Sequence, residues 1–109
     1  MRNTRKVAFF TGNRAEYGLQ FPLIRAVDEH PSLDYRLLVS GAHLDENVGN
    51  SVNEIINDGF KIASKIRISF GNVKATATAH AIASGIREVS DALLKIKPDF
   101  LVVYADRFE

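Results

Sequence analysis

Apolar residues in this chain gather in four short runs, separated by longer stretches of helical period. Residues 6–10 (KVAFF) form an almost continuous apolar run, which is typical of a strand buried on both faces of a sheet. Residues 35–40 (YRLLVS) and 100–104 (FLVVY) are predicted to be strands as well. Residues 60–68 alternate apolar and polar side chains, which predicts a strand nearer the edge of the sheet.

Helices are predicted between these strands. The first is indicated by Tyr17, Phe21, Ile24 and Val27, which recur every three or four residues. Pro22 lies inside that stretch, so we expect a kink or a late helix start there. A short helix is predicted over residues 51–57. The longest is predicted over residues 73–97, with an apolar stripe at Ile82, Ile86, Val89, Leu93 and Ile96.

This alternation of strands and helices predicts an α/β fold, a Rossmann-like open parallel sheet of about four strands with helices on both faces. Right-handed crossovers and the usual winding give the strand order 3-2-1-4. The length of 109 residues suits one domain at most.

Composition removes several classes of protein. The chain has 14 Lys and Arg residues and 13 Asp and Glu residues, which gives a net charge of +1. This charge excludes nucleic-acid binding through bulk charge. The sequence contains no cysteine, which excludes a disulfide scaffold, an iron–sulfur cluster and a thiol nucleophile and fits a reducing cytoplasm. The apolar run at residues 7–10 is too short for a signal peptide or a membrane span. We therefore expect a cytoplasmic protein.

Polar segments follow the first, second and fourth predicted strands, at residues 11–18, 41–44 and 105–109. In open parallel sheets, ligands bind outside the carboxyl ends of the strands, where the winding reverses. Here that point lies between the first and fourth strands. The sequence therefore predicts that these segments converge on one binding edge.

The segment after the first strand has neither the G-x-G-x-x-G pattern of dinucleotide sites nor the Gly-Lys-Ser/Thr of a P-loop. Gly12 lets the backbone approach a ligand, and a helix N-terminus there favours an anion. Arg14 is either a ligand for a phosphate or carboxylate group, held by two hydrogen bonds, or a solvated helix-start residue. Glu16 fits a first-turn residue favoured by the helix dipole better than a catalyst.

The segment after the fourth strand offers a carboxylate, Asp106, that is either tuned for proton transfer or paired with Arg107 as a loop residue. Arg107 in turn either contacts a phosphate or pairs with Asp106 or Glu109. His43, after a strand and a glycine, is a candidate hydrogen-bonding residue of the site.

Other polar residues are assigned to the surface or to packing. His30 and His80 belong to this group, and no histidine–carboxylate spacing indicates a metal site. A loose basic stretch lacks interleaved aromatic residues, so a solvated face is favoured over nucleic-acid contact. Its members are Lys61, Lys65, Arg67 and Lys74.

Several motifs resemble one enzyme family. Residues 11–18 (TGNRAEYG), with PLI at 22–24, resemble the opening of the hydrolysing UDP-N-acetylglucosamine 2-epimerases, in the branch serving sialic acid and legionaminic acid synthesis. GAHL at 41–44 followed by GN at 49–50, DGF at 58–60, and KPD at 97–99 through DRFE at 106–109 continue the resemblance. Ala105 departs from it, because the family commonly has glycine there.

This resemblance implies two Rossmann-like domains of the glycosyltransferase-B architecture, with a UDP-sugar such as UDP-N-acetylglucosamine between them. Its members eliminate UDP to leave a glycal, then add water to give the 2-epimerised free sugar. The resemblance makes Asp106 a catalytic carboxylate and Arg14 and Arg107 contacts of the nucleotide sugar, with His43 and Gly12 near the site. It implies no cofactor and no metal.

The family's other catalytic carboxylates and its second domain lie beyond position 109. Residues 1–109 are therefore expected to form the N-terminal part of the first domain and to be inactive alone. The parent enzyme is expected to be a homo-oligomer. The partial sheet of residues 1–109 exposes an unpartnered edge, so this part alone is also expected to self-associate.

Two further readings stay open. One is half of a nucleotide-sugar glycosyltransferase, against which the DRFE and NRAEY motifs argue. The other is a non-catalytic flavodoxin-like binding module or a receiver-type domain. A receiver needs clustered acidic residues after the first strand, where this chain has TGNR.

Overall fold

The computed structural model describes residues 4–12, 14–40, 52–68 and 73–103, with only the backbone of residues 14 and 15. Strands and helices alternate along the chain, as the sequence predicts. The elements are β1 (Arg5–Thr11), α1 (Arg14–Glu29), β2 (Leu33–Ser40), α2 (Val52–Asn57), β3 (Ile62–Ile66), the 3-10 turn η3 (Lys74–Thr76), α3 (Ala77–Ile96) and β4 (Phe100–Val103).

The four strands form one sheet in the order β3-β2-β1-β4, and every pair is parallel. This confirms the predicted order and places β3 at an edge. Val7 of β1 lies opposite both Tyr35 of β2 and Phe100 of β4, so β1 has a strand on either side. β3 is shorter than predicted, and its register with β2 shifts between Leu37 and Leu38.

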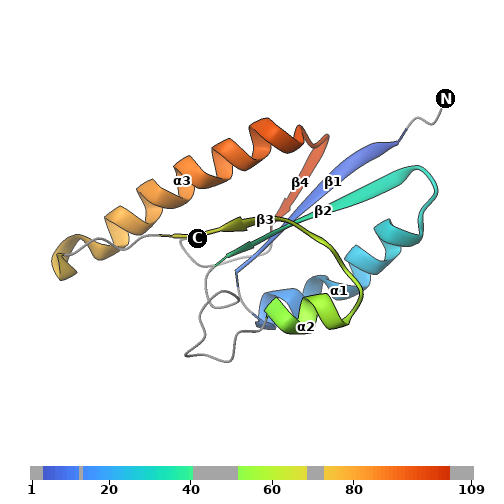
Figure 1. Cartoon of the computed structure of the whole chain (residues 1–109), viewed down its shortest axis with the longest axis horizontal. Helices are drawn as coiled ribbons and strands as arrows, with labels where there is room; N and C mark the ends of the chain where they lie inside the picture. The colour runs from blue at the N-terminus through green and yellow to red at the C-terminus, as the bar shows by residue number, and fades with distance from the viewer. Residues whose placement is uncertain (1–3, 13, 41–51, 69–72, 104–109) are drawn as a thin grey trace.

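Helices cover both faces of the sheet: α1 and α2 lie on one side and α3 on the other (Figure 1). Alternating side chains of β1 divide between these layers. Val7 and Phe9 belong to the core under α1 and α2, and Ala8 and Phe10 to the core under α3. Because β1 is buried on both faces, its sequence has to be a continuous apolar run.

Helix α1 begins at Arg14 and continues through Pro22, so the expected late helix start was wrong. Proline removes the hydrogen bond to the carbonyl four residues earlier, here that of Gly18. Both residues are exposed, so water can hydrate that carbonyl. The opposite side of the helix buries Tyr17 and Ile24, and this packing favours continuing the helix across the proline.

The start of β4 is fastened to β1 at the amino edge of the sheet. Lys97 adopts the left-handed conformation (φ 52°) and donates its N–H to the Leu93 carbonyl at 2.8 Å, which ends α3. Asp99 then accepts the Lys6 N–H at 2.8 Å and donates its own N–H to the Lys6 carbonyl at 2.9 Å. This pair of hydrogen bonds aligns β4 beside β1.

The apolar stripe predicted for α3 is buried only in its second half. Val89, Leu93 and Ile96 pack against the core, but Ile82 and Ile86 are 40% and 64% exposed. In Figure 1 the first half of α3 extends past the short strand β4. Its buried side chains are small ones, Ala81 and Ser84. The spacing of the large apolar residues therefore predicted the wrong buried face for the first half of α3.

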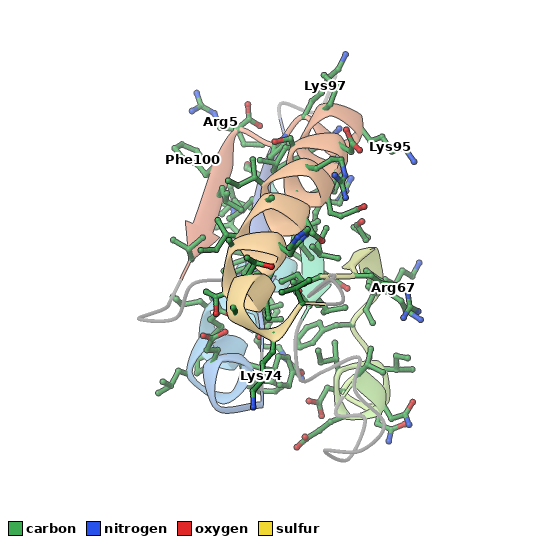
Figure 2. All side chains as sticks on the ribbon, turned by 90° about the vertical axis from the view of Figure 1, so that its left-hand side faces the viewer. Arg5, Arg67, Lys74, Lys95, Lys97 and Phe100 are labelled. Atoms are coloured by element: carbon green, nitrogen blue, oxygen red, sulfur yellow. The ribbon has the colours of Figure 1, made fainter. Side chains whose placement is uncertain are left out.

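Apolar side chains remain exposed along α3 and β4. Phe100, Leu101 and Val103 are 53%, 41% and 63% exposed, and Figure 2 shows Phe100 at the outer side of β4. Leu101 and Val103 also line an open groove of about 340 Å³ between β4 and α3. This edge strand has the character that invites pairing with another chain.

The basic stretch is a solvated surface, as expected. Lys61, Lys65, Arg67 and Lys74 are all exposed. Figure 2 shows Arg67 and Lys74 on separate parts of the surface rather than in one patch. Within the described part of the chain, no helix is long and apolar enough to cross a membrane.

Burial predicts different costs for the same substitution at two helical isoleucines. Ile24 of α1 is fully buried, so Ile24→Ala should lower the free energy of unfolding by about 3 kcal/mol. Ile86→Ala, at an exposed site of α3, should change it by less than about 0.5 kcal/mol. Urea denaturation followed by circular dichroism measures both. Equal losses would contradict this assignment of the core.

Candidate functional site

The carboxyl ends of β1, β2 and β4 lie level at one edge of the sheet. Thr11 pairs with Val39, the residue before Ser40, and Phe10 pairs with Val103. The strands are parallel, so the segments that follow them all leave from this edge. The prediction that the winding reverses between the first and fourth strands is confirmed.

The turn between β1 and α1 is closed by a buried hydrogen bond. Gly12 donates its N–H to Glu16 Oε1 at 2.8 Å, and the Glu16 side chain is only 8% exposed. Glu16 lies in the first turn of α1, where a carboxylate is favoured by the unpaired N–H groups and the helix dipole. Glu16 is thus a residue that shapes the turn, in line with the first-turn role expected from its position.

A second side chain of α1 holds the same stretch of backbone. Gln20 donates Nε2–H to the Phe10 carbonyl at 3.1 Å, and its side chain is 1% exposed. The sequence analysis did not single out Gln20. The signal was available, because Gln20 lies between Tyr17 and Phe21 on the apolar stripe of α1, where a polar residue needs a buried partner.

The site residues predicted from sequence are described unequally. Gly12 is buried at the end of β1, and Arg14 begins α1, with its side chain outside the description. His43, Asp106 and Arg107 lie outside the described residues. The structure therefore brings the ends of the three strands together, and the roles of these residues stay predictions.

A side-chain hydrogen bond joins α1 to Asp58, the residue that follows α2. Tyr17 donates its hydroxyl proton to Asp58 Oδ2 at 2.6 Å. Phe60 and Phe21 pack edge-on in the same region, and the Arg25 guanidinium lies 5.1 Å from the Phe21 ring centroid. The pKa of Tyr17 is raised well above its ordinary value, mainly by burial of the phenol and to a smaller extent by the hydrogen bond to Asp58 and the negative charge of that carboxylate. The phenol therefore stays protonated and keeps donating.

The opposite, amino edge also has a hollow, of about 550 Å³, lined by residues of β2 and β3. Asp34, Arg36 and Lys61 give it mixed charge. Its position is at the starts of the strands, where parallel sheets of this type do not place their ligands. We therefore assign the candidate site to the carboxyl edge.

Nothing in the described ranges gathers three or more histidine, aspartate or glutamate side chains in a way that could hold a metal ion. At the described part of the carboxyl edge, α1 begins at Arg14, and the Glu16 carboxylate and the Gln20 amide are buried and hydrogen-bonded to the backbone. A helix start with an arginine suits an anionic ligand.

Comparison with known proteins fits this architecture. The sequence profile described as UDP-N-acetylglucosamine 2-epimerase matches residues 25–109. The chain belongs to this family. The matched region contains the His43 and Asp106 segments, but it starts after the turn that contains Gly12 and Arg14.

Individual relatives match nearly the whole chain. It is 32% identical over 105 residues to UDP-N,N'-diacetylbacillosamine 2-epimerase (hydrolyzing) of Legionella pneumophila, covering 96% of this chain and 28% of the relative. It is 30% identical to polysialic acid biosynthesis protein P7 of Escherichia coli, covering 96% and 27%. The chain thus spans little more than a quarter of the length of these family members.

A solved structure shares the fold. The UDP-GlcNAc 2-epimerase of Neisseria meningitidis, bound to UDP-GlcNAc, superposes with a TM-score of 0.75 at 17% identity, over 94% of this chain and 26% of that chain. A second UDP-N-acetylglucosamine 2-epimerase structure gives 0.76 at 19% identity, over 96% and 28%. The described strand order is therefore that of a family fold.

The raised pKa of Tyr17 predicts how stability depends on pH. In the unfolded chain the phenol loses its proton near its ordinary value of 10.0, whereas in the folded chain it keeps the proton to a higher pH. Its contribution is therefore full below pH 10.0 and is lost as the pH rises above that value. Wild type should be more stable than Tyr17→Phe near neutral pH, and that advantage should shrink in alkali.

Urea denaturation of both proteins from about pH 8 to about pH 11 measures this difference. Ionisation of other groups affects both proteins alike, so the difference isolates Tyr17. A constant difference across that range would contradict the Tyr17–Asp58 account.

Proposed function

We propose that this chain is the N-terminal part of the first Rossmann-like domain of a hydrolysing nucleotide-sugar 2-epimerase, and that the second domain lies in sequence beyond residue 109. The observation that carries the proposal is the parallel order β3-β2-β1-β4. In this order β4 lies next to β1, the strand that leads into the start of α1 at Arg14, which supports a site shared by the segments after these two strands. Family membership supplies the reaction class.

The proposed substrate is a UDP-sugar carrying an acetamido group next to the anomeric carbon, such as UDP-N-acetylglucosamine or a bacillosamine derivative. Two similar proteins support this substrate: the Legionella relative is a UDP-N,N'-diacetylbacillosamine 2-epimerase, and the Neisseria structure is bound to UDP-GlcNAc. The proposed products are UDP and the free 2-epimer, such as N-acetylmannosamine. The sialic acid branch is supported by the likeness to the polysialic acid protein.

The proposed reaction has two steps. A base removes the proton from the second carbon of the sugar while the bond from the first carbon to the diphosphate oxygen breaks, which gives a glycal and UDP. Water then adds its hydroxyl to the first carbon, and a proton returns to the second carbon from the other face. The proton on that carbon is weakly acidic, so a placed carboxylate is needed.

Each candidate residue has a part in this scheme. Asp106 moves a proton, and the guanidinium groups of Arg14 and Arg107 stabilise the departing diphosphate. His43 hydrogen-bonds near the sugar, and Gly12 allows the turn to approach the ligand closely. The proposal requires no cofactor and no metal.

We also propose a cellular location and an assembly state for the enzyme. We propose that the enzyme is cytoplasmic, because a sequence without cysteine suits a reducing compartment. We expect the parent enzyme to be a homo-oligomer. The exposed apolar residues of β4 suit burial against further polypeptide, which in the parent includes the rest of the first domain.

Ligand titration separates this proposal from its alternatives. In isothermal titration calorimetry the chain should bind UDP and UDP-N-acetylglucosamine, but neither flavin mononucleotide nor acetyl phosphate. Arg14→Ala should weaken UDP binding about tenfold or more, because a hydrogen bond to a charged group contributes about 1.5–3 kcal/mol. Arg87→Ala, which removes an exposed cation of α3, is the matched control and should leave affinity unchanged. Preference for flavin or acetyl phosphate would favour the non-catalytic readings.

The 109 residues alone should not turn over substrate, since further carboxylates and a second domain are needed. A coupled assay for UDP released from UDP-N-acetylglucosamine tests this. Release above the level of a heat-denatured sample would refute it.

In a longer form that includes the second domain, Asp106→Asn should abolish turnover and leave the melting temperature unchanged. The amide keeps the size of the carboxylate but cannot accept the proton. Near-normal epimer formation in that variant would remove Asp106 from the mechanism. Sugar transfer to an acceptor, with no free 2-epimer, would favour the glycosyltransferase reading.

A further inference from the structure

Two buried side chains of α1 hold the last residues of β1 from one side. Glu16 and Gln20 are four residues apart, so they lie on the same face of the helix. Glu16 Oε1 accepts the Gly12 N–H at 2.8 Å, and Gln20 Nε2–H donates to the Phe10 carbonyl at 3.1 Å. We call this pair the turn clamp.

The turn clamp acts at a demanding place in the fold. Both side chains are more than nine-tenths buried, at 8% and 1% exposure. Burial of a carboxylate or an amide is unfavourable unless hydrogen bonds replace those to water. One hydrogen bond of each side chain goes to the backbone at the end of β1, while the buried Gln20 Oε1 has no hydrogen-bond partner among the described residues. The position of Gly12 relative to the start of α1 is therefore fixed from inside the protein.

The clamp also limits what the turn can offer a ligand. The Gly12 N–H already points at Glu16, so it is engaged before any anion arrives. An anion at this edge then has to be held by other groups, for which the start of α1 and Arg14 are the candidates. These groups are useful only if the turn is held in one geometry, because ordering a loose turn on binding costs affinity.

We propose that Glu16 and Gln20 are positioning residues, which set the affinity of the β1–α1 turn for the diphosphate of a UDP-sugar without touching it. This rests on the proposed function, since it assumes that UDP binds at this edge. The role belongs to the hydrogen bonds and not to the charge of Glu16. Glutamine at position 16 keeps an acceptor oxygen at nearly the same reach, so it should keep the turn in place.

The test compares UDP affinity in the 109-residue chain by calorimetry, well below the melting temperature of each variant. Glu16→Ala should weaken binding about tenfold, whereas Glu16→Gln should stay within about threefold of wild type. Glu29→Ala removes an exposed carboxylate from the end of the same helix and should have no effect. Gln20→Leu, which keeps the volume but loses the donor, should weaken binding several-fold and serves where Glu16→Ala does not fold.

Each result decides something different. Unchanged affinity in folded Glu16→Ala or Gln20→Leu would overturn the positioning role, because a purely structural contribution lowers the melting temperature but not the affinity of the folded protein. Equal losses in Glu16→Ala and Glu16→Gln would assign the effect to charge and also overturn it. Failure of wild type itself to bind UDP would instead contradict the proposed function, and this inference with it.

Discussion

Parallel pairing on both sides of β1 is the constraint on which the rest of the structure depends. β1 has β2 and β4 as neighbours and packs against helices on both faces, so its residues are buried in nearly every direction. A parallel neighbour can be reached only by a crossover, and right-handed crossovers put α1 and α3 on opposite faces. The same geometry brings the ends of three strands to one edge. The position of the candidate site is thus a consequence of the sheet.

Hydrogen bonds at the two ends of β1 complete this arrangement. At the amino edge, Asp99 exchanges two hydrogen bonds with the backbone of Lys6 and sets the start of β4. At the carboxyl edge, Glu16 and Gln20 hold the turn into α1. Each set includes hydrogen bonds from a polar side chain outside the strand to the backbone of β1 or of the residue after it. The apolar run decides that β1 is central, and these polar residues decide how its neighbours are aligned.

Much of the fold could be predicted from the sequence, because long apolar runs and helical periods report burial directly. The order of the strands followed from handedness rules. The site was harder, since hydrogen bonds to backbone carry no periodic pattern: Gln20 reads as a polar interruption of a stripe, and the Tyr17–Asp58 bond joins residues 41 positions apart. The exposure of Ile86 was missed for a related reason, because spacing shows which residues share a face but not where the sheet ends.

The central claim is that the carboxyl edge of this sheet binds the nucleotide part of a UDP-sugar. The most direct measurement is a backbone amide chemical-shift map of the 15N-labelled chain with and without UDP. The account predicts saturable shifts at Thr11, Gly12 and Glu16, with the amides of the opposite edge unchanged. Shifts confined to the hollow near Asp34 and Lys61, or no shifts at all, would contradict it.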